Sequence, residues 1–329
     1  MIGDSAGALW SQTRLAAPPT LEMASLESMP GILREQGIRH LFVNSSRDLR
    51  SAIRGTFFHP NTCSLTLLQH MQMGAPKRDP LHTWMYSRLH SWVAPLPWLA
   101  DQARLMTRIS PGKVREIPHG IRLDRFMSGK PSREDARRIM QLPANAHITG
   151  TVGRLDRGKG QEHLIRATAL LAAQGRDVHA LVVGDDTAGE TQRYGEFLSS
   201  LTREHGIRDR VHFRPARSDV ETAYKAMDIF ALTSISETYG LVTIEAMAAG
   251  IPIIGTRSGG TPEVLREGVT GLLVAPEDPA ELADAIRILS DSPDTAAGLA
   301  HNGAAEAVQR FSHEAQCAAL EGLVVEAMG

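Results

Sequence analysis

The sequence predicts an α/β protein in which a parallel, doubly wound sheet forms the second half. From residue 147 onward, short β-branched runs alternate with amphipathic stretches of helical length, a pattern typical of βαβ units. The chain has 329 residues, of which 42% are hydrophobic and 22% charged, so it is long enough to bury the cores of two domains. Sheets of this kind bind ligands at the carboxyl ends of their strands, and functional residues are therefore expected in the strand-to-helix loops.

Each strand of the second half is predicted from a run of apolar and β-branched residues, at 147–153, 178–184, 210–216, 228–234, 251–256 and 270–276. Helices are expected in the intervals, and the spacing of Ser218 and Glu221 predicts a capping box at the start of one of them. The patterning changes near residue 145, so we expect two domains, at 1–143 and 144–329.

The composition argues against several classes of protein. No run of eighteen apolar residues is present, and the first ten residues lack the basic start of a secretion signal, which favours a cytoplasmic location. Cys63 and Cys317 are distant in sequence and form no CxxC pair, and no two histidines have HxxxH spacing. We therefore expect neither a disulfide framework nor a metal. A net charge of −2, without a basic and aromatic binding motif, argues against nucleic acid.

Charge is distributed unevenly between the two halves of the chain. Residues 1–145 contain 19 Lys and Arg against 11 Asp and Glu, whereas the remainder contains 16 against 26. A basic first half is suited to an anionic acceptor or to the acidic inner face of a membrane, at about 1 kcal/mol per well-placed basic residue. An ordinary solvated surface is the alternative interpretation.

The first loop with unusual residues is "TVGRLDRGKGQEHL", at 151–164. Gly153 ends a predicted strand, and Arg154 and Lys159 follow before a predicted helix. Glycine lets the backbone approach a bulky group closely, and the two cations can donate charge-assisted hydrogen bonds. A diphosphate would use all three features, although a solvated turn would contain the same residue types. The loop is neither a P-loop nor a GxGxxG motif.

The second loop precedes the helix predicted in "SETYGLVTIEAMAAGIPII", at 236–254. The first N–H groups of a helix lack intrahelical partners, so they favour phosphate together with the helix dipole. Glu245 falls in the second helical turn, where a carboxylate can accept two hydrogen bonds from a ribose diol. Glu237 precedes the helix and is expected to point further along the ligand. The alternative is a helix-start glutamate and a surface glutamate.

The third loop, "TRSGGTPEVLREG", places Gly259 and Gly260 after a strand and Pro262 near a helix start. The glycine pair permits a close backbone approach, either to a ligand or within a tight strand-to-helix connection.

Together these loops resemble the family 4 glycosyltransferases, which are retaining enzymes of the GT-B fold that use nucleotide-sugar donors. The resemblance extends in order over about 180 residues, through "VGRLDRGKG", "VVGD", "FRPARSDV" and "ALTSISETYGLVTIEAMAAGIPIIGTRSGGTPEVLREGVTGLLV". It implies two Rossmann-like domains facing across a cleft, with a C-terminal helix, at 311–329, that crosses back toward the first domain.

The resemblance also implies roles for individual residues. Arg154 and Lys159, beside Gly153, bind the donor diphosphate, and Glu245 binds the nucleotide ribose. Glu237, which opens the family's E-x7-E motif, contacts the transferred sugar. Backbone donors to the diphosphate come from Thr238, Tyr239, Gly240 and Leu241.

In that reaction the nucleoside diphosphate leaves from the anomeric carbon as an acceptor hydroxyl attacks, and negative charge develops on the leaving group. Arg154 and Lys159 are therefore expected to act in catalysis as well as in binding. Glu237 completes the catalytic set, together with His70, which aligns with a family histidine that faces the transferred sugar. Protein groups replace a divalent ion in such enzymes, and Asp185-Asp186 is interpreted as a turn.

The first half matches the family less closely. His119 occupies a position where the family usually has asparagine, so no role is transferred to it. The aromatic residues near Arg88 are interpreted as packing residues, with membrane docking as the alternative; they are Trp84, Tyr86, Trp92 and Trp98, with Met85 among them. The first 23 residues show neither the strand nor the glycine-rich loop with which family members open. The N-terminal domain is thus expected to be shortened by its first βα unit, to have it replaced by another chain, or to start internally.

The predicted function is transfer of a hexosyl group from a nucleotide sugar to a carbohydrate or glycolipid acceptor, in envelope polysaccharide or lipopolysaccharide synthesis. No cofactor is expected beyond the donor substrate. The enzyme is expected to be cytoplasmic, with peripheral contact at the inner face of the membrane. Two alternatives stay open at this stage, namely a non-catalytic donor-binding subunit and a sugar-nucleotide epimerase of the same fold. The choice of nucleotide, sugar and acceptor depends on pocket shape, which these motifs do not specify.

Overall fold

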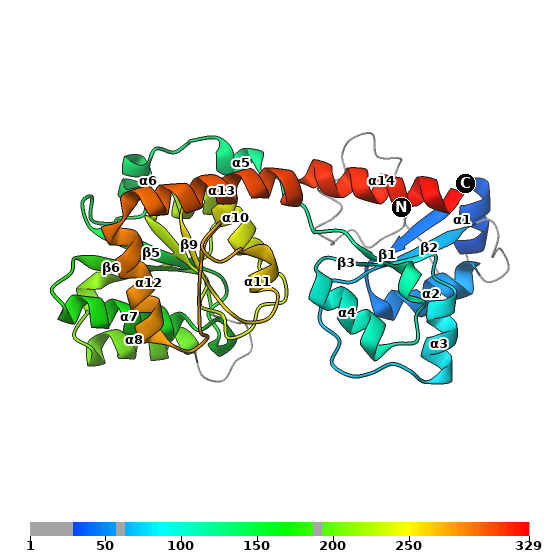
Figure 1. The fold of residues 1–329 in the computed structure, drawn as a ribbon, viewed down its shortest axis with the longest axis horizontal. Helices are drawn as coiled ribbons and strands as arrows, with labels where there is room; N and C mark the ends of the chain where they lie inside the picture. The colour runs from blue at the N-terminus through cyan, green and yellow to red at the C-terminus, as the bar shows by residue number, and fades with distance from the viewer. Residues whose placement is uncertain (1–28, 57–62, 187–192, 329) are drawn as a thin grey trace. The chain divides into compact units, whose positions relative to one another are not determined.

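Two α/β units make up the chain, each with its own parallel sheet (Figure 1). The computed structural model describes residues 29–56, 63–186 and 193–328. Unit 1 comprises residues up to Arg122 together with the segment from His313 onward, and unit 2 is Leu123–Ser312. The opening residues, on which the expectation of a missing first βα unit depends, lie outside the described part of the chain.

Unit 1 contains a sheet of order β1-β2-β3-β4, in which all the neighbouring strands are parallel. Its strands are β1 (His40–Val43), β2 (Ser64–Leu68), β3 (Ser91–Ala94) and β4 (Val114–Glu116). Its helices are α1 (Met29–Glu35), α2 (Ser46–Thr56), α3 (Pro80–Ser87), α4 (Pro97–Met106), the short η3 (Pro111–Lys113) and α14 (His313–Met328). The main core of this unit joins α1–α4 to the strands.

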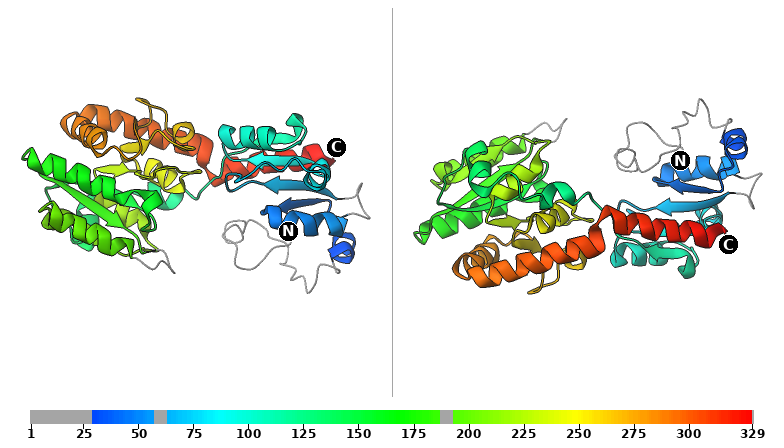
Figure 2. Two further views of the ribbon diagram at one scale, coloured as in Figure 1. Left: turned by 90° about the horizontal axis from the view of Figure 1, so that it is seen from below. Right: turned by 90° about the horizontal axis from the view of Figure 1, so that it is seen from above.

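The last helix, α14, belongs to unit 1 although it follows unit 2 in the sequence. Its Leu320 and Leu323 pack with Leu68 of β2 and Val93 of β3, and Figure 2 shows the helix, in red, lying along the sheet of this unit. Burial of these apolar side chains favours the docked helix at roughly 25 cal/mol per Å². The chain therefore returns to its first domain at the C-terminus.

Unit 2 contains a sheet of order β10-β9-β8-β5-β6-β7, again with parallel neighbours. Its strands are β5 (His147–Val152), β6 (Val178–Val183), β7 (Val211–Arg214), β8 (Ile229–Ala231), β9 (Ile253–Thr256) and β10 (Leu272–Val274). Its first helices are α5 (Asp124–Met127), α6 (Arg133–Ile139), η4 (Arg157–Lys159), α7 (Gln161–Ala173), α8 (Tyr194–Glu204) and η5 (Arg208–Arg210). The others are α9 (Val220–Ala226), α10 (Leu241–Ala249), α11 (Thr261–Val264), α12 (Pro279–Asp291) and α13 (Pro293–Phe311).

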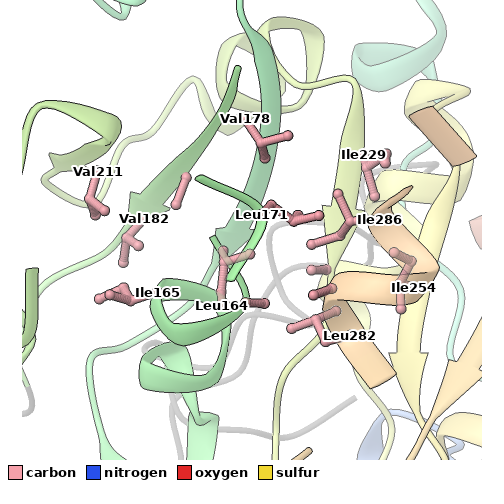
Figure 3. Packing of buried hydrophobic residues seen from close by; sticks show 14 of the residues in the cluster. Leu164, Ile165, Leu171, Val178, Val182, Val211, Ile229, Ile254, Leu282 and Ile286 are labelled. Atoms are coloured by element: carbon pink, nitrogen blue, oxygen red, sulfur yellow. The ribbon is translucent and has the colours of Figure 1, made fainter. Parts of the chain in front are cut away.

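One core cluster of unit 2 joins its strands to helices α7, α8 and α12. Figure 3 shows Leu171 of α7 beside Ile286 of α12, with Ile254 of β9 nearby. α7 follows β5, whereas α12 comes more than 100 residues later in the chain. These contacts therefore join two segments of unit 2 that are distant in sequence. Fully buried aliphatic side chains of this kind each contribute about 1.5–3 kcal/mol.

The boundary between the units differs from the predicted one, because 123–143 belongs to unit 2. Buried Arg137 of α6 pairs with Asp228 at 2.6 Å and donates to the carbonyl oxygens of Ala144 and Ala226. Arg125 pairs with Glu221 of α9. These contacts join residues 123–143 to elements about 90 residues later in the chain. Local sequence patterns do not reveal such contacts, so the sequence could not place the boundary.

Candidate functional site

The centre of unit 2 is the point at which the strand order reverses. β5 lies between β6 and β8. The chain adds β6 and β7 on one side of β5, and then β8, β9 and β10 on the other side. The loops after β5 and β8 therefore lie at the carboxyl ends of two adjacent strands, at the switch point where doubly wound sheets bind ligands. These are the first and second loops singled out in the sequence.

The first and second loops are fastened to each other by direct hydrogen bonds. The Ile235 N–H donates to the carbonyl oxygen of Gly158 at 2.9 Å, and the Thr233 hydroxyl donates to that of Lys159 at 2.9 Å. Gly160 has φ +64°, and a Cβ there would lie less than 3.0 Å from the Thr233 carbonyl oxygen. Only glycine allows this approach without a shift of backbone.

An ion pair joins the tips of the two loops. The Lys159 Nζ lies 2.6 Å from Glu237 Oε2, and the two side chains are 30% and 14% exposed. Glu237 also accepts hydrogen bonds from the Ser234 hydroxyl at 3.2 Å and, through Oε1, from the Thr238 N–H at 3.2 Å. The carboxylate is therefore held in one orientation by three donors on two loops.

The third loop also contacts Glu237, through backbone atoms. The Gly260 N–H donates to the Glu237 carbonyl oxygen at 2.8 Å. Gly259 has φ +59°, and a Cβ there would again lie less than 3.0 Å from that oxygen. The Thr256 hydroxyl donates to the Ser234 carbonyl oxygen at 2.7 Å. The glycine pair thus serves a tight connection between loops, and all three loops converge on Glu237.

Helix α10 begins beside this carboxylate. Gly240 is its N-cap in the left-handed conformation, and exposed Leu241 is its first residue, while Tyr239 is buried against Phe311. The first N–H groups of a helix have no intrahelical acceptors and lie at the positive end of its dipole. The start of α10 can therefore bind an anion next to the Lys159–Glu237 pair.

Arg154 takes no part in the Lys159–Glu237 ion pair. It follows Gly153 at the end of β5, its side chain is 68% exposed, and its guanidinium lies 3.7 Å from Asp156. Such an exposed ion pair contributes little to stability. Asp156 caps η4 through the Lys159 N–H. The structure thus brings Lys159 and Glu237 together and leaves Arg154 at the solvent-exposed edge of the same loop.

Glu245 lies on α10, one helical turn beyond its start. Its Oε2 accepts a hydrogen bond from the hydroxyl of buried Tyr224 at 2.7 Å. Burial raises the pKa of Glu245, whereas the Tyr224 hydrogen bond and Arg125 act in the opposite direction. The two glutamates of the E-x7-E spacing therefore have different partners, Lys159 for one and Tyr224 for the other.

Replacement of Glu245 by glutamine is expected to stabilise unit 2 at pH 8 but not near pH 4. A carboxyl whose folded pKa is raised stabilises the fold fully below its unfolded value of 4.5 and loses that contribution as pH rises through the folded pKa. Glutamine is uncharged, so it avoids the cost of burying an ionised carboxylate at high pH. Its amide oxygen can still accept the hydrogen bond from the Tyr224 hydroxyl. Thermal unfolding at both pH values tests this, and a variant less stable than the parent protein at pH 8 would contradict it.

His70 lies in unit 1, just after β2. Its Nδ1 is 3.3 Å from Nε2 of His119, and the ring centroids are 4.9 Å apart with planes inclined by 16°. Burial lowers the pKa of His70, and burial followed by the nearby His70 lowers the pKa of His119 to about 4. The two imidazoles are therefore a neutral, hydrogen-bonded pair at physiological pH.

The aromatic segment around Arg88 is largely core, as the packing interpretation predicted. Met85, Tyr86 and Trp92 are buried, and Tyr86 contacts Trp92 edge-on with ring centroids 5.1 Å apart. Trp84 is 45% exposed.

The paired aspartates after β6 bind backbone N–H groups, but they do not form the turn that was predicted, because Asp186 pairs with Leu155 in an isolated parallel β-bridge. Asp185 accepts from the Ala216 N–H at 3.3 Å and Asp186 from the Gly195 N–H at 2.7 Å. Across residues 29–56, 63–186 and 193–328, no group of three His, Cys, Asp or Glu side chains is arranged to hold a metal ion. Within the same ranges, no helix is both long and apolar enough to cross a membrane.

Several residues at these sites were missed by the sequence analysis. Ser234, Asp156 and Tyr224 contact the predicted residues directly, and His119 contacts His70. Asp156 lies three residues before Lys159, which is the spacing of a capping residue, and this could have indicated its hydrogen bond with the Lys159 N–H. The contacts of Tyr224 and His119 join distant segments and had no local signal.

The fold is that of a doubly wound α/β protein, in which three loops converge on Glu237 beside the switch point of the second sheet. The sequence pattern of the family described as glycosyl transferases group 1 matches residues 132–306, which is more than half of the chain. The chain belongs to this family.

Curated relatives of this chain include D-inositol 3-phosphate glycosyltransferases. A D-inositol 3-phosphate glycosyltransferase from Saccharomonospora viridis is 34% identical over 234 residues, which are 70% of this chain and 54% of that protein. The corresponding protein of Actinosynnema mirum is 36% identical over 214 residues, 63% of this chain and 51% of the relative. The chain thus spans about half the length of the curated relatives it matches.

Solved structures share the fold. Anabaena HepE in complex with UDP superposes with a TM-score of 0.81 at 24% identity, over 91% of this chain and 82% of that one. Sucrose-phosphate synthase from Thermosynechococcus elongatus gives a TM-score of 0.74 at 25% identity, over 95% and 82%. The fold is the GT-B type, with two Rossmann-like domains.

Proposed function

We propose that this chain is a retaining family 4 glycosyltransferase that moves a hexosyl group from a nucleoside diphosphate sugar to an acceptor hydroxyl. The observation that carries the proposal is the Lys159–Glu237 ion pair at the sheet's switch point, beside the start of α10. A cation, a fixed carboxylate and unpaired helix N–H groups together suit a ligand with a diphosphate at one end and a polyol at the other. HepE, which shares the fold, has been crystallised with UDP and with UDP-glucose.

Each part of the donor has a proposed partner. Lys159, Arg154 and the N–H groups of Thr238–Leu241 bind the diphosphate, with Gly153 allowing its close approach. Glu245 accepts from the ribose hydroxyls. Glu237, fixed by Ser234 and Lys159, accepts from hydroxyls of the transferred sugar. His70 of unit 1 donates to the same sugar.

The proposed chemistry is front-face substitution. The bond between the anomeric carbon and the diphosphate oxygen breaks, the acceptor oxygen forms its bond on the same face, and the acceptor proton passes to the departing phosphate. Arg154 and Lys159 stabilise the negative charge that develops on the diphosphate. No metal and no cofactor takes part in this scheme. Isolation of a covalent glycosyl-enzyme adduct would contradict it.

The proposed setting is envelope polysaccharide, lipopolysaccharide or glycolipid synthesis, in the cytoplasm or at the inner face of the membrane. The acceptor is a carbohydrate or a glycolipid, and the names of the curated relatives add inositol phosphate to the candidates. Exposed Leu81 and Trp84 on α3, next to the basic Lys77 and Arg78, are the residues proposed for peripheral membrane contact.

A panel of nucleotide sugars tests the proposal. A donor present at 100 times its dissociation constant should stabilise the protein by about 2.7 kcal/mol, which thermal unfolding detects. Donors that pass are then supplied with oligosaccharide, glycolipid and inositol phosphate acceptors, and the product's anomeric configuration is read by NMR. An isomerised donor without acceptor would indicate an epimerase, and binding without any turnover a donor-binding subunit. If no donor stabilises the protein, the proposed function is wrong.

A further inference from the structure

Two histidines and a glutamine from three distant segments meet in unit 1. His70 follows β2, His119 follows β4, and Gln316 lies on α14. β2 and β4 both lie parallel to β3, which separates them in the sheet, so His70 and His119 leave it at the same edge. This is the edge at which parallel sheets bind ligands. His119 occupies the position where the family resemblance led us to expect asparagine, so no family role was transferred to it.

The direction of each hydrogen bond in this group follows from donor chemistry. The Gly120 N–H can only donate, so Gln316 presents Oε1 to it, at 3.0 Å. The Gln316 amide nitrogen therefore faces His119 Nδ1, at 3.5 Å. An amide nitrogen donates and does not accept, so Nδ1 of His119 carries no proton.

The tautomers of both rings are then fixed in turn. Because burial keeps His119 neutral, with a pKa of about 4, its single proton is on Nε2. That proton is donated to Nδ1 of His70, 3.3 Å away. His70, also neutral because burial lowers its pKa, must carry its own proton on Nε2.

We propose that Gln316 and His119 are positioning residues that hold His70 as an Nε2–H donor directed at an oxygen of the transferred sugar. The role of His70 rests on the proposed function, whereas the tautomer relay does not. A ring fixed in this way presents a hydrogen-bond donor and no base, so His70 orients the sugar and does not deprotonate the acceptor. The C-terminal helix thereby contributes to catalysis from a residue that contacts no substrate.

The relay is tested in the full chain by NMR of protein labelled with ¹⁵N at histidine, without substrate. The His70 signals are assigned as those lost in His70→Gln. We expect an unprotonated Nδ1 and a protonated Nε2 for both His70 and His119. Gln316→Met and His119→Phe should each release His70 into exchange between its tautomers. A proton on Nδ1 of His70 in the parent protein, or a tautomer unchanged in both variants, would overturn the relay.

Transfer kinetics test the link to function. Gln316→Met should lower kcat/KM about tenfold, the effect of one lost hydrogen bond. The matched control is His212→Phe. His212 and His179 form a similar stacked pair near the amino ends of β7 and β6, with Nδ1 of His179 2.9 Å from Nε2 of His212. We expect His212→Phe to change neither kcat/KM nor the His70 spectrum. Equal losses in the two variants would overturn the positioning role, and if the parent protein transfers no sugar, the NMR result still decides the relay.

Discussion

Arg154→Ala is expected to lower kcat/KM for sugar transfer by about 10²- to 10³-fold, the usual effect of removing one electrostatic contact to a developing negative charge. The guanidinium is 68% exposed and its ion pair with Asp156 is long, at 3.7 Å. Its removal should therefore change the free energy of unfolding by no more than about 0.5 kcal/mol. A large loss of transfer in an equally stable protein would identify Arg154 as a functional residue.

The matched control lies three residues further along the same loop. Arg157 is also exposed, but its guanidinium lies over the rings of Tyr194 and Phe197, 5.8 and 5.1 Å from their centroids. Arg157→Ala should leave transfer unchanged and cost about 0.5–1 kcal/mol of stability through the lost cation–π contacts. Initial rates at varied donor concentration and urea unfolding separate the two effects. Equal losses of transfer in both variants would show that the loop's net charge matters and not the position of Arg154.

Gly259→Ala is expected to destabilise the protein by about 2–5 kcal/mol and to reduce transfer with it. The left-handed φ of +59° alone costs about 1–2 kcal/mol with a side chain present. A Cβ would also clash with the carbonyl oxygen of Glu237, and a clash in a packed site costs about a further 1–3 kcal/mol. The atom that must move is backbone at Glu237, so the carboxylate would lose its position beside Lys159.

Gly268→Ala separates conformational strain from the clash. Gly268 has nearly the same φ, +67°, but a Cβ there would have no heavy atom within 4 Å. This variant should lose only about 1–2 kcal/mol and keep its transfer activity. Chemical denaturation of both variants gives the difference, which measures the contact between Gly259 and Glu237. If the two variants were equally stable and equally active, that contact would have no role in holding the site.

The βαβ order of the second half was predictable because it depends on local periodicity. All six predicted strands form, although β8 is only Ile229–Ala231. The loops with Lys159, Glu237 and Gly259 follow directly from those strands, so their position at the carboxyl edge of the sheet was predictable as well. The capping box at Ser218 and Glu221 was wrong. Asp219 is the N-cap of α9, while Glu221 and the Ser218 carbonyl group both bind Arg125.

The amino-acid sequence by itself determined the order of the elements and the family, because both depend on patterns within short segments of the chain. Tertiary structure alone decided which side chains share a partner. Tyr224 reaches Glu245, α6 docks on α9, and α14 brings Gln316 to His119. The physical reason is that a hydrogen bond or a packed face depends on distances between segments far apart in the chain, and these are set when the whole core closes.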